Sequence, residues 1–184
     1  AYGVQGIYSA PGKAVKEAYD SAGVVANDRG ITVWLKGNRV SRNQIMAIKE
    51  ESVTDQKNSL TVCLDNILRH AGITRNTEYD LAQGKTAIQI LEENMTGVQV
   101  LDLSGCSLDA VLYYVNQDIP VLAILEDGEA VLVTGFNEFN VVIMEPSTGK
   151  LYKKGMNDAT TWFAENGNHF ISYMKIDNLS LIHI

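Results

Sequence analysis

The change of hydrophobic periodicity along the chain is the feature that most constrains its fold. Between residues 60 and 116 the apolar residues recur mainly at helical spacing. From residue 120 onward they form short continuous runs, at 121–125 and 130–134, separated by a turn that contains Asp127-Gly128, and this pattern predicts a β-hairpin. Helices followed by hairpin-connected strands indicate an α+β fold, with N-terminal helices packed on an antiparallel sheet.

The clearest helix is predicted over residues 60–71. Asn58 or Ser59 can cap its start, and Gly72 ends it. Its apolar stripe consists of Leu60, Cys63, Leu64, Ile67, Leu68 and Ala71. The same reasoning predicts helices at 86–93 and 107–116, a helix capped by Asn157 or Asp158 that runs to 166, and strands at 98–103, 141–144 and 169–174.

The first 52 residues form a separate section in this interpretation. A helix is expected at 12–22, a hairpin from 24–26 and 31–35, and a third strand around 45–48. We therefore divide the chain into a small α+β appendage or spacer at 1–52, a main domain at 53–177, and a tail at 178–184. The tail resembles the translation of a sequencing adapter, and we expect it to be non-native.

Composition excludes several classes of function. The chain has 184 residues, of which 46% are hydrophobic, so it can build a packed core. A net charge of -7 argues against a nucleic-acid partner, and no stretch approaches the roughly 20 apolar residues that span a bilayer. Cys63 and Cys106 are too few and too widely spaced for a zinc site, so we expect neither a metal nor a cofactor. Whether these cysteines are paired or free stays open.

Three segments of the main domain resemble the C39 family of papain-like bacterial cysteine peptidases. That family reads Q-x5-C-G-P-A-C/S-L-x-x-I/L-L, followed by H-x-V-V-V-x-G and then D-P-x-x-G. In this chain, SLTVCLDNIL at 59–68 is similar to the nucleophile helix, EAVLVTGF at 129–136 to the histidine strand, and EPSTG at 145–149 to the acidic turn. The resemblance implies a papain-like fold with an N-terminal appendage. It also implies a bacterial source and suggests the cell surface or the extracellular space, although the residues leave the compartment open.

The resemblance places substituted residues at the catalytic positions. The nucleophile position falls on Ser59, the histidine position on Glu129, and the acid position on Glu145. The oxyanion-hole glutamine position falls on Val53, with Gln56 three residues before Ser59 instead of six. A carboxylate with a pKa near 4.3 is a poor base for a serine hydroxyl and has no proton to donate at neutral pH. We therefore expect a catalytically degenerate domain that binds an extended peptide, such as a leader peptide, or serves as a module of a larger protein.

The alternative is an active cysteine peptidase or acyl transferase that uses Cys63. Its thiol would need a histidine, and His70 lies seven residues along the same helix, about 10 Å away at roughly 1.5 Å per residue. His169, at the start of the last strand, is then the candidate base. A cysteine in an apolar helix stripe is more often a small core residue.

Overall fold

The computed structural model describes residues 4, 6–21, 23–36 and 44–176. These residues form six helices and nine strands. The helices are α1 (Pro11–Asp20), α2 (Ser59–His70), α3 (Glu78–Ala82), α4 (Ala87–Asn94), α5 (Leu108–Asn116) and α6 (Met156–Glu165). The strands are β1 (Val24–Ala26), β2 (Thr32–Leu35), β3 (Gln44–Ile45), β4 (Val98–Asp102), β5 (Val121–Ile124), β6 (Ala130–Phe136), β7 (Asn140–Glu145), β8 (Lys150–Gly155) and β9 (Phe170–Lys175).

A seven-stranded antiparallel sheet organises the molecule. Its strands run in the order β4-β9-β5-β6-β7-β8, and β3 pairs with the end of β6. The β5–β6 hairpin pairs Ile124 with Ala130 and Val121 with Val133. β9 returns from the far end of the chain to lie between β4 and β5, which brings residues near 100 and 170 side by side.

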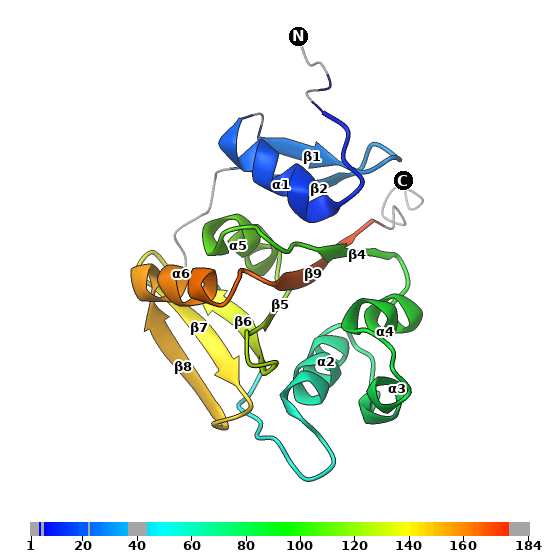
Figure 1. Ribbon diagram of the computed structural model, residues 1–184, viewed down its shortest axis with the longest axis vertical. Helices are drawn as coiled ribbons and strands as arrows, with labels where there is room; N and C mark the ends of the chain where they lie inside the picture. Colours follow the sequence, from blue (N-terminus) through cyan, green and yellow to red (C-terminus); the bar gives the residue numbers. More distant parts are fainter. Residues whose placement is uncertain (1–3, 5, 22, 37–43, 177–184) are drawn as a thin grey trace.

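Helices cover this sheet from both sides. Every residue of β6 is buried, so both of its faces are covered, and both α2 and α5 contact it. Figure 1 shows α2, α3 and α4 grouped apart from α5 and α6. α2 therefore crosses one face of the sheet, with its first residue near the β5–β6 turn and its last residue near the opposite end of β5.

The N-terminal segment packs on the edge of this assembly. α1 contacts α5 and β4, and β1 pairs with β2 in a separate two-stranded sheet. Trp34 of β2 is buried, and its indole Nε1 donates a hydrogen bond to the Ala110 carbonyl at 2.9 Å. The strand expected near residues 45–48 is observed as β3, and it pairs with β6 of the larger sheet instead of with the β1–β2 hairpin.

The α+β class, the antiparallel sheet and most of the predicted elements are confirmed, with three differences. The predictions omitted α3 and β8, which both lack an apolar repeat. The predicted cap of α6 by Asn157 or Asp158 is wrong, because the helix begins at Met156 directly after β8, and Gly155 occupies the cap position. The predicted tail at 178–184 lies outside the described residues.

Candidate functional site

Ser59, the predicted nucleophile position, is the first residue of α2. Asn58 caps this helix, and its Oδ1 accepts a hydrogen bond from the Thr61 N–H at 2.9 Å. The Ser59 side chain is only 2% exposed, and its Oγ accepts a hydrogen bond from the Ala130 N–H at 2.8 Å. The hydroxyl therefore connects the start of the helix to the start of β6, across 71 residues of sequence.

Glu129, the predicted histidine position, lies directly beside this contact. It precedes Ala130, and its backbone closes the β5–β6 turn: its carbonyl accepts from the Leu125 N–H, and its N–H donates to Asp127 Oδ1. Its carboxylate makes no hydrogen bond or ion pair with the residues that the structure describes. The fold thus brings the Ser59 and Glu129 positions together, while the Ser59 hydroxyl bonds to backbone and not to the Glu129 side chain.

Glu145, the predicted acid position, is held within its own turn. Its Oε2 accepts a hydrogen bond from Thr148 Oγ1 at 2.8 Å, and its Oε1 accepts one from the Tyr152 hydroxyl at 3.1 Å. Burial, together with the charge and hydrogen bond of Glu145, raises the pKa of Tyr152 to about 12. Neither contact joins Glu145 to Glu129 or Ser59.

Neither Val53 nor Gln56, the two positions considered for the oxyanion-hole glutamine, makes a side-chain hydrogen bond to Ser59 or another described residue of the site. The Val53 N–H donates a hydrogen bond to the Pro146 carbonyl at 3.1 Å, so the segment runs along the turn between β7 and β8. The Val53 side chain is 38% exposed and has no donor for an oxyanion. Gln56 is exposed, and no side-chain hydrogen bond to another described residue orients it.

Cys63, the alternative nucleophile, lies in the core. Its side chain is fully buried, and this burial, with a smaller effect from the charge of Glu51, raises the pKa of the thiol well above its ordinary value. Cys106 is also buried and free, and its Sγ donates to the Gly12 carbonyl at 3.3 Å. Burial raises the pKa of Cys106 to about 12. Both thiols are therefore held in the unreactive neutral form.

The two described histidines have other partners. His70 Nε2 lies 3.0 Å from the Asp118 carbonyl oxygen and 3.5 Å from Asp118 Oδ2. His169 is half-exposed, and its Nε2 lies 4.0 Å from Glu126 Oε1. Within residues 44–176, neither imidazole makes a hydrogen bond to Cys63, so no thiolate–imidazole pair is formed there.

We expect both thiols to be protected from alkylation in the folded protein. Because burial raises the pKa of Cys63 and of Cys106, the thiols should stay protonated as the pH rises through 9, where an exposed cysteine ionises. Mass spectrometry after iodoacetamide treatment between pH 6 and pH 9 should show slow labelling, with a large acceleration in denaturing urea. Rapid labelling of native Cys63 at pH 6 would instead support the active-thiol alternative, and Cys63→Ala provides the control for site assignment.

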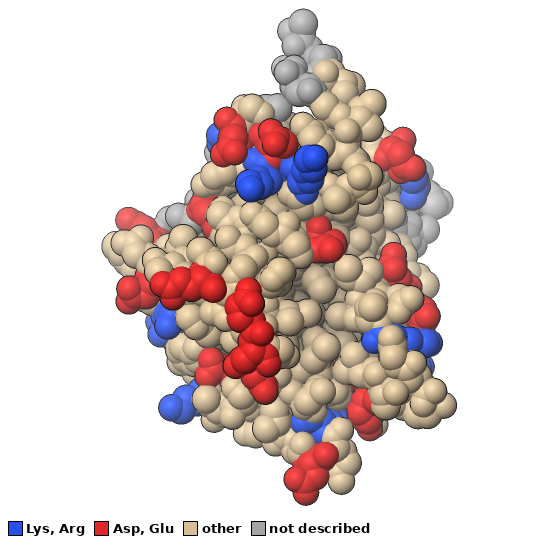
Figure 2. Space-filling view, viewed as in Figure 1, with Lys and Arg blue, Asp and Glu red and all other residues tan. Residues whose placement is uncertain are grey.

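A pocket of about 370 Å³ lies beside the β5–β6 turn. Apolar side chains of Ile124, Leu125 and Ile171 line it together with Asp102, Glu126 and His169. Figure 2 shows acidic side chains gathered over the turn between β5 and β6. The turn carries Glu126 and Asp127, which are exposed, and Glu129, which is partly exposed. This end of the sheet therefore combines an apolar depression with a negative rim.

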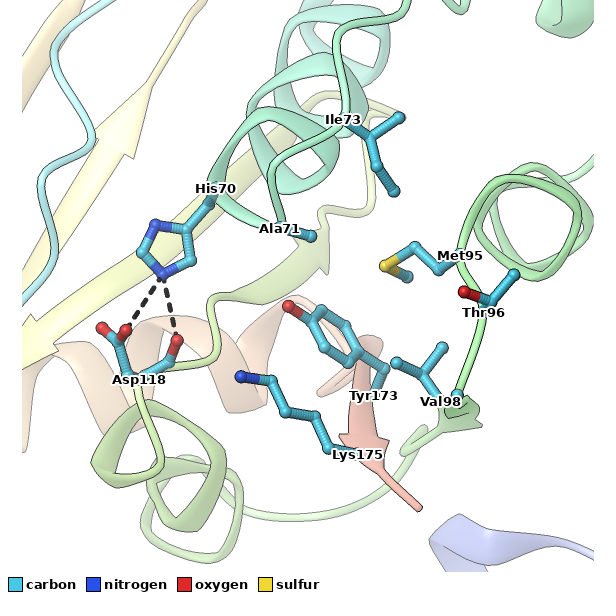
Figure 3. A pocket seen from close by; sticks show the side chains of 10 residues that line it. His70, Ala71, Ile73, Met95, Thr96, Val98, Asp118, Tyr173 and Lys175 are labelled. Carbon is cyan, nitrogen blue, oxygen red and sulfur yellow. Dashed lines mark hydrogen bonds and ion pairs between the residues drawn. The ribbon is translucent and has the colours of Figure 1, made fainter. Parts of the chain in front are cut away.

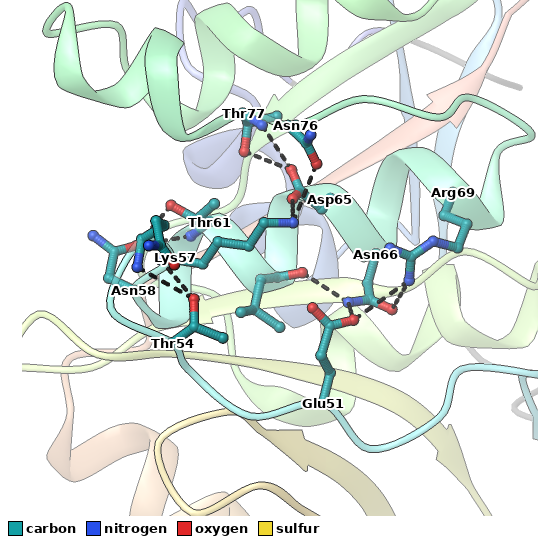
Figure 4. Close-up of polar contacts among 12 residues, drawn as sticks. Glu51, Thr54, Lys57, Asn58, Thr61, Asp65, Asn66, Arg69, Asn76 and Thr77 are labelled. Carbon is teal, nitrogen blue, oxygen red and sulfur yellow. Dashed lines mark hydrogen bonds and ion pairs between the residues drawn. The ribbon is translucent and has the colours of Figure 1, made fainter.

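A buried polar cluster connects α2 to the residues that precede it and to the loop before α3. Figure 4 shows Asp65 pointing from the helix toward Lys57 and Thr77. Asp65 is 1% exposed: its Oδ2 pairs with Lys57 Nζ at 3.0 Å, and its Oδ1 accepts hydrogen bonds from the backbone N–H and the hydroxyl of Thr77. The Asp65 hydrogen bond is the largest effect that raises the pKa of Lys57. The cluster fixes the residues before Ser59 against the loop before α3.

Two further properties concern the described part of the chain only. No group of three or more histidine, cysteine, aspartate or glutamate side chains is placed there to hold a metal ion. None of the helices there combines the length and the apolar character that a bilayer crossing requires.

Comparison with known proteins identifies the fold. No protein-family model matches the sequence, and no curated protein matches it. Among solved structures, the chain is similar to a Bacillus anthracis protein described as a "putative C39-like peptidase", with a TM-score of 0.60 and 16% sequence identity. The match covers 73% of this chain and 98% of that one. The chain therefore has a mixed helix and antiparallel-sheet fold similar to that of a C39-like peptidase.

Proposed function

We propose that this chain is a catalytically inactive, papain-like domain of the C39 type that binds a cationic, extended peptide beside the β5–β6 turn. The observation that carries the proposal is the hydrogen bond from the Ala130 N–H to Ser59 Oγ. It supports the assignment of the nucleophile and base positions, since it joins the first turn of α2 to the residue that follows Glu129. At the same time it favours a structural role for the serine hydroxyl, whose oxygen accepts from the backbone of β6.

Three properties of the site argue against turnover. Ser59 is buried at 2% exposure, so a peptide carbonyl has no access to its oxygen. Glu129 replaces the imidazole that would take a proton from the nucleophile and return it to the leaving amine. Val53 stands where a glutamine would donate to the oxyanion, and loss of one such donor costs about 10² to 10³ in rate.

The chemistry of the surroundings favours a basic peptide as the occupant. The pocket next to the turn has apolar walls that suit the stem of a lysine or arginine side chain, which keeps its charged end in water. Glu126, Asp127 and Glu129 then lie where the cationic ends would approach. In a chain of net charge -7, this local negative rim adds to the general attraction for cations.

The first test is hydrolysis. Purified protein is expected to leave casein and peptides with double-glycine leaders intact, both with and without a reductant. The same assay on Cys63→Ala separates any contaminating protease from the chain's own activity. Turnover that Cys63→Ala abolishes would overturn the inactive assignment and support the alternative enzyme that uses Cys63 with His169.

The second test is binding of a fluorescent octapeptide of alternating lysine and glycine, measured by anisotropy at low salt. We expect Glu126→Lys to weaken binding about fivefold, because one attraction is replaced by a repulsion of the size usual for exposed charges. Glu92→Lys makes the same change of net charge on the exposed face of α4 and should leave binding almost unchanged. Equal losses in both variants, or equal binding of a glutamate–glycine peptide, would contradict a site at the turn.

A further inference from the structure

A second cavity lies at the other end of α2. It has a volume of about 490 Å³ and is formed where the end of α2 approaches the loop after α4 and the outer ends of β4 and β9. Ser59 is the first residue of α2 and His70 its last, so the cavity and the β5–β6 turn are separated by about 17 Å at 1.5 Å per residue. An inference about this cavity therefore does not depend on the proposed function.

One side of the cavity is apolar. Figure 3 shows Ile73, Met95 and Val98 together on this side. Ile73 and Val98 are partly buried against the hydrophobic core, and Met95 is 6% exposed. A branched aliphatic group bound here would leave water and pack against these three apolar side chains, which is favourable because it buries apolar surface.

The other side carries two hydrogen-bond donors, Lys175 and Tyr173, that have no side-chain partner among the described residues. Lys175 is exposed at the rim and makes no ion pair with the described carboxylates. Tyr173 is 2% exposed as a residue, yet its hydroxyl makes no hydrogen bond to a described residue. In Figure 3 the Lys175 ammonium and the Tyr173 hydroxyl both extend toward the side of the cavity that holds His70. Burial, and secondarily the charge of Asp118, raises the pKa of Tyr173, which keeps this hydroxyl a neutral donor.

The acidic group at this side already has a partner. Asp118 faces His70, whose Nε2 lies 3.0 Å from the Asp118 carbonyl oxygen and 3.5 Å from its carboxylate. A carbonyl oxygen can only accept, so the Nε2 atom carries a proton and points it at Asp118. Lys175 itself makes no ion pair with Asp118 or with another described carboxylate, so its ammonium is available to a ligand.

We propose that this cavity binds a carboxylate that is attached to a branched aliphatic group, with the carboxylate between Lys175 and Tyr173 and the aliphatic group against Ile73, Met95 and Val98. Two sources carry this chemistry: the free C-terminus of a peptide that ends in leucine or a similar residue, and a small free carboxylic acid. A carboxylate has acceptors for both donors, and the charge-assisted bond to an ammonium is the stronger of the two contacts.

N-acetyl-leucine is the probe for the test, with binding to the full chain followed by amide chemical-shift changes in NMR titrations. The expected result is saturable shifts at residues around the cavity, with N-acetyl-leucinamide binding at least about tenfold more weakly because it lacks the charge. Acetyl-Gly-Gly-Leu distinguishes the two sources: binding supports a peptide C-terminus, and failure of this peptide alone supports a small free acid. No saturable binding of N-acetyl-leucine, or equal binding of the amide, would overturn the proposal.

Variants of the two donors locate the contact. Lys175→Met should weaken N-acetyl-leucine binding about tenfold, and Tyr173→Phe should weaken it by a smaller factor, because the first removes a charge and the second a neutral donor. Lys175 is exposed, so its replacement leaves the fold intact. Lys153→Met on β8 removes the same charge from an exposed position on another element and should leave the affinity unchanged. Equal affinities of Lys175→Met and Lys153→Met would contradict this assignment.

Discussion

Replacing Asp65 with alanine is expected to lower the free energy of unfolding by about 3 kcal/mol, because it removes the acceptor that two buried donors of Thr77 share. Thr77 is 0% exposed, and both its N–H and its hydroxyl donate to Asp65 Oδ1, at 2.9 and 2.8 Å. The loss of the Asp65 carboxylate affects Lys57 less, since the Lys57 side chain is 24% exposed and also donates a hydrogen bond to Asn76 Oδ1. The dominant effect should therefore come from Thr77 and not from the ion pair.

Urea unfolding of three further variants separates these contributions. Asp65→Asn keeps an oxygen for Thr77 but removes the charge, so we expect it to retain a large part of the lost stability. Lys57→Met should cost about 1 kcal/mol or less, as is usual for partly exposed pairs. Asp55→Ala is the matched control, because it removes an exposed carboxylate from the loop before α2. Its free energy of unfolding should change by no more than about 0.5 kcal/mol. A loss for Lys57→Met as large as that for Asp65→Ala would show that the ion pair, and not Thr77, dominates.

The elements that could be predicted from the sequence are those that bury one apolar face. The stripe on α2 and the continuous runs in β5 and β6 reflect packing against the core, and each was recognisable from residue spacing alone. β8 reads Lys-Leu-Tyr-Lys-Lys-Gly and is the last strand of its sheet, where charged residues are compatible with a strand that has one neighbour. α3 has five residues, and ion pairs of Asp80 with Arg75 and Lys85 accompany it in place of an apolar stripe.

The candidate site, like the fold, could be predicted from the sequence only in part. The family resemblance placed Ser59 and Glu129 at related positions, and the fold connects their segments through the hydrogen bond from the Ala130 N–H to Ser59 Oγ. Their assignment as degenerate catalytic positions stays a prediction. The use of the Ser59 hydroxyl as an acceptor for Ala130 could not be predicted, since it depends on two elements 71 residues apart. Asp65 was missed because a single acidic residue among apolar ones is typical of the solvent side of a helix, whereas here it faces the loop at Thr77.

The second large effect is expected for Trp34→Ala, which tests how residues 1–52 relate to the rest of the chain. Trp34 is 2% exposed, its Nε1 donates to the Ala110 carbonyl of α5, and its ring lies 6.3 Å from that of Tyr19 and 6.5 Å from that of Tyr113. In addition, the Tyr114 hydroxyl donates to the Val33 carbonyl at 2.7 Å. Removing a buried tryptophan side chain costs about 3–5 kcal/mol where the surroundings cannot collapse into the space.

The chain offers a direct readout, because Trp162 on α6 is the second of its two tryptophans and remains as the reporter in Trp34→Ala. If the N-terminal segment folds as one unit with the larger sheet, the Trp162 fluorescence transition in urea should move to lower urea by the full loss of stability. Trp34→Phe retains the aromatic ring and should lose less, while Leu35→Ala, on the same strand but 43% exposed, is the matched control. An unchanged Trp162 transition, with circular dichroism showing early loss of part of the structure, would instead support an independent appendage. The outcome decides whether residues 1–52 act as a spacer or as part of the structure that supports α5 and, through it, β6 of the candidate site.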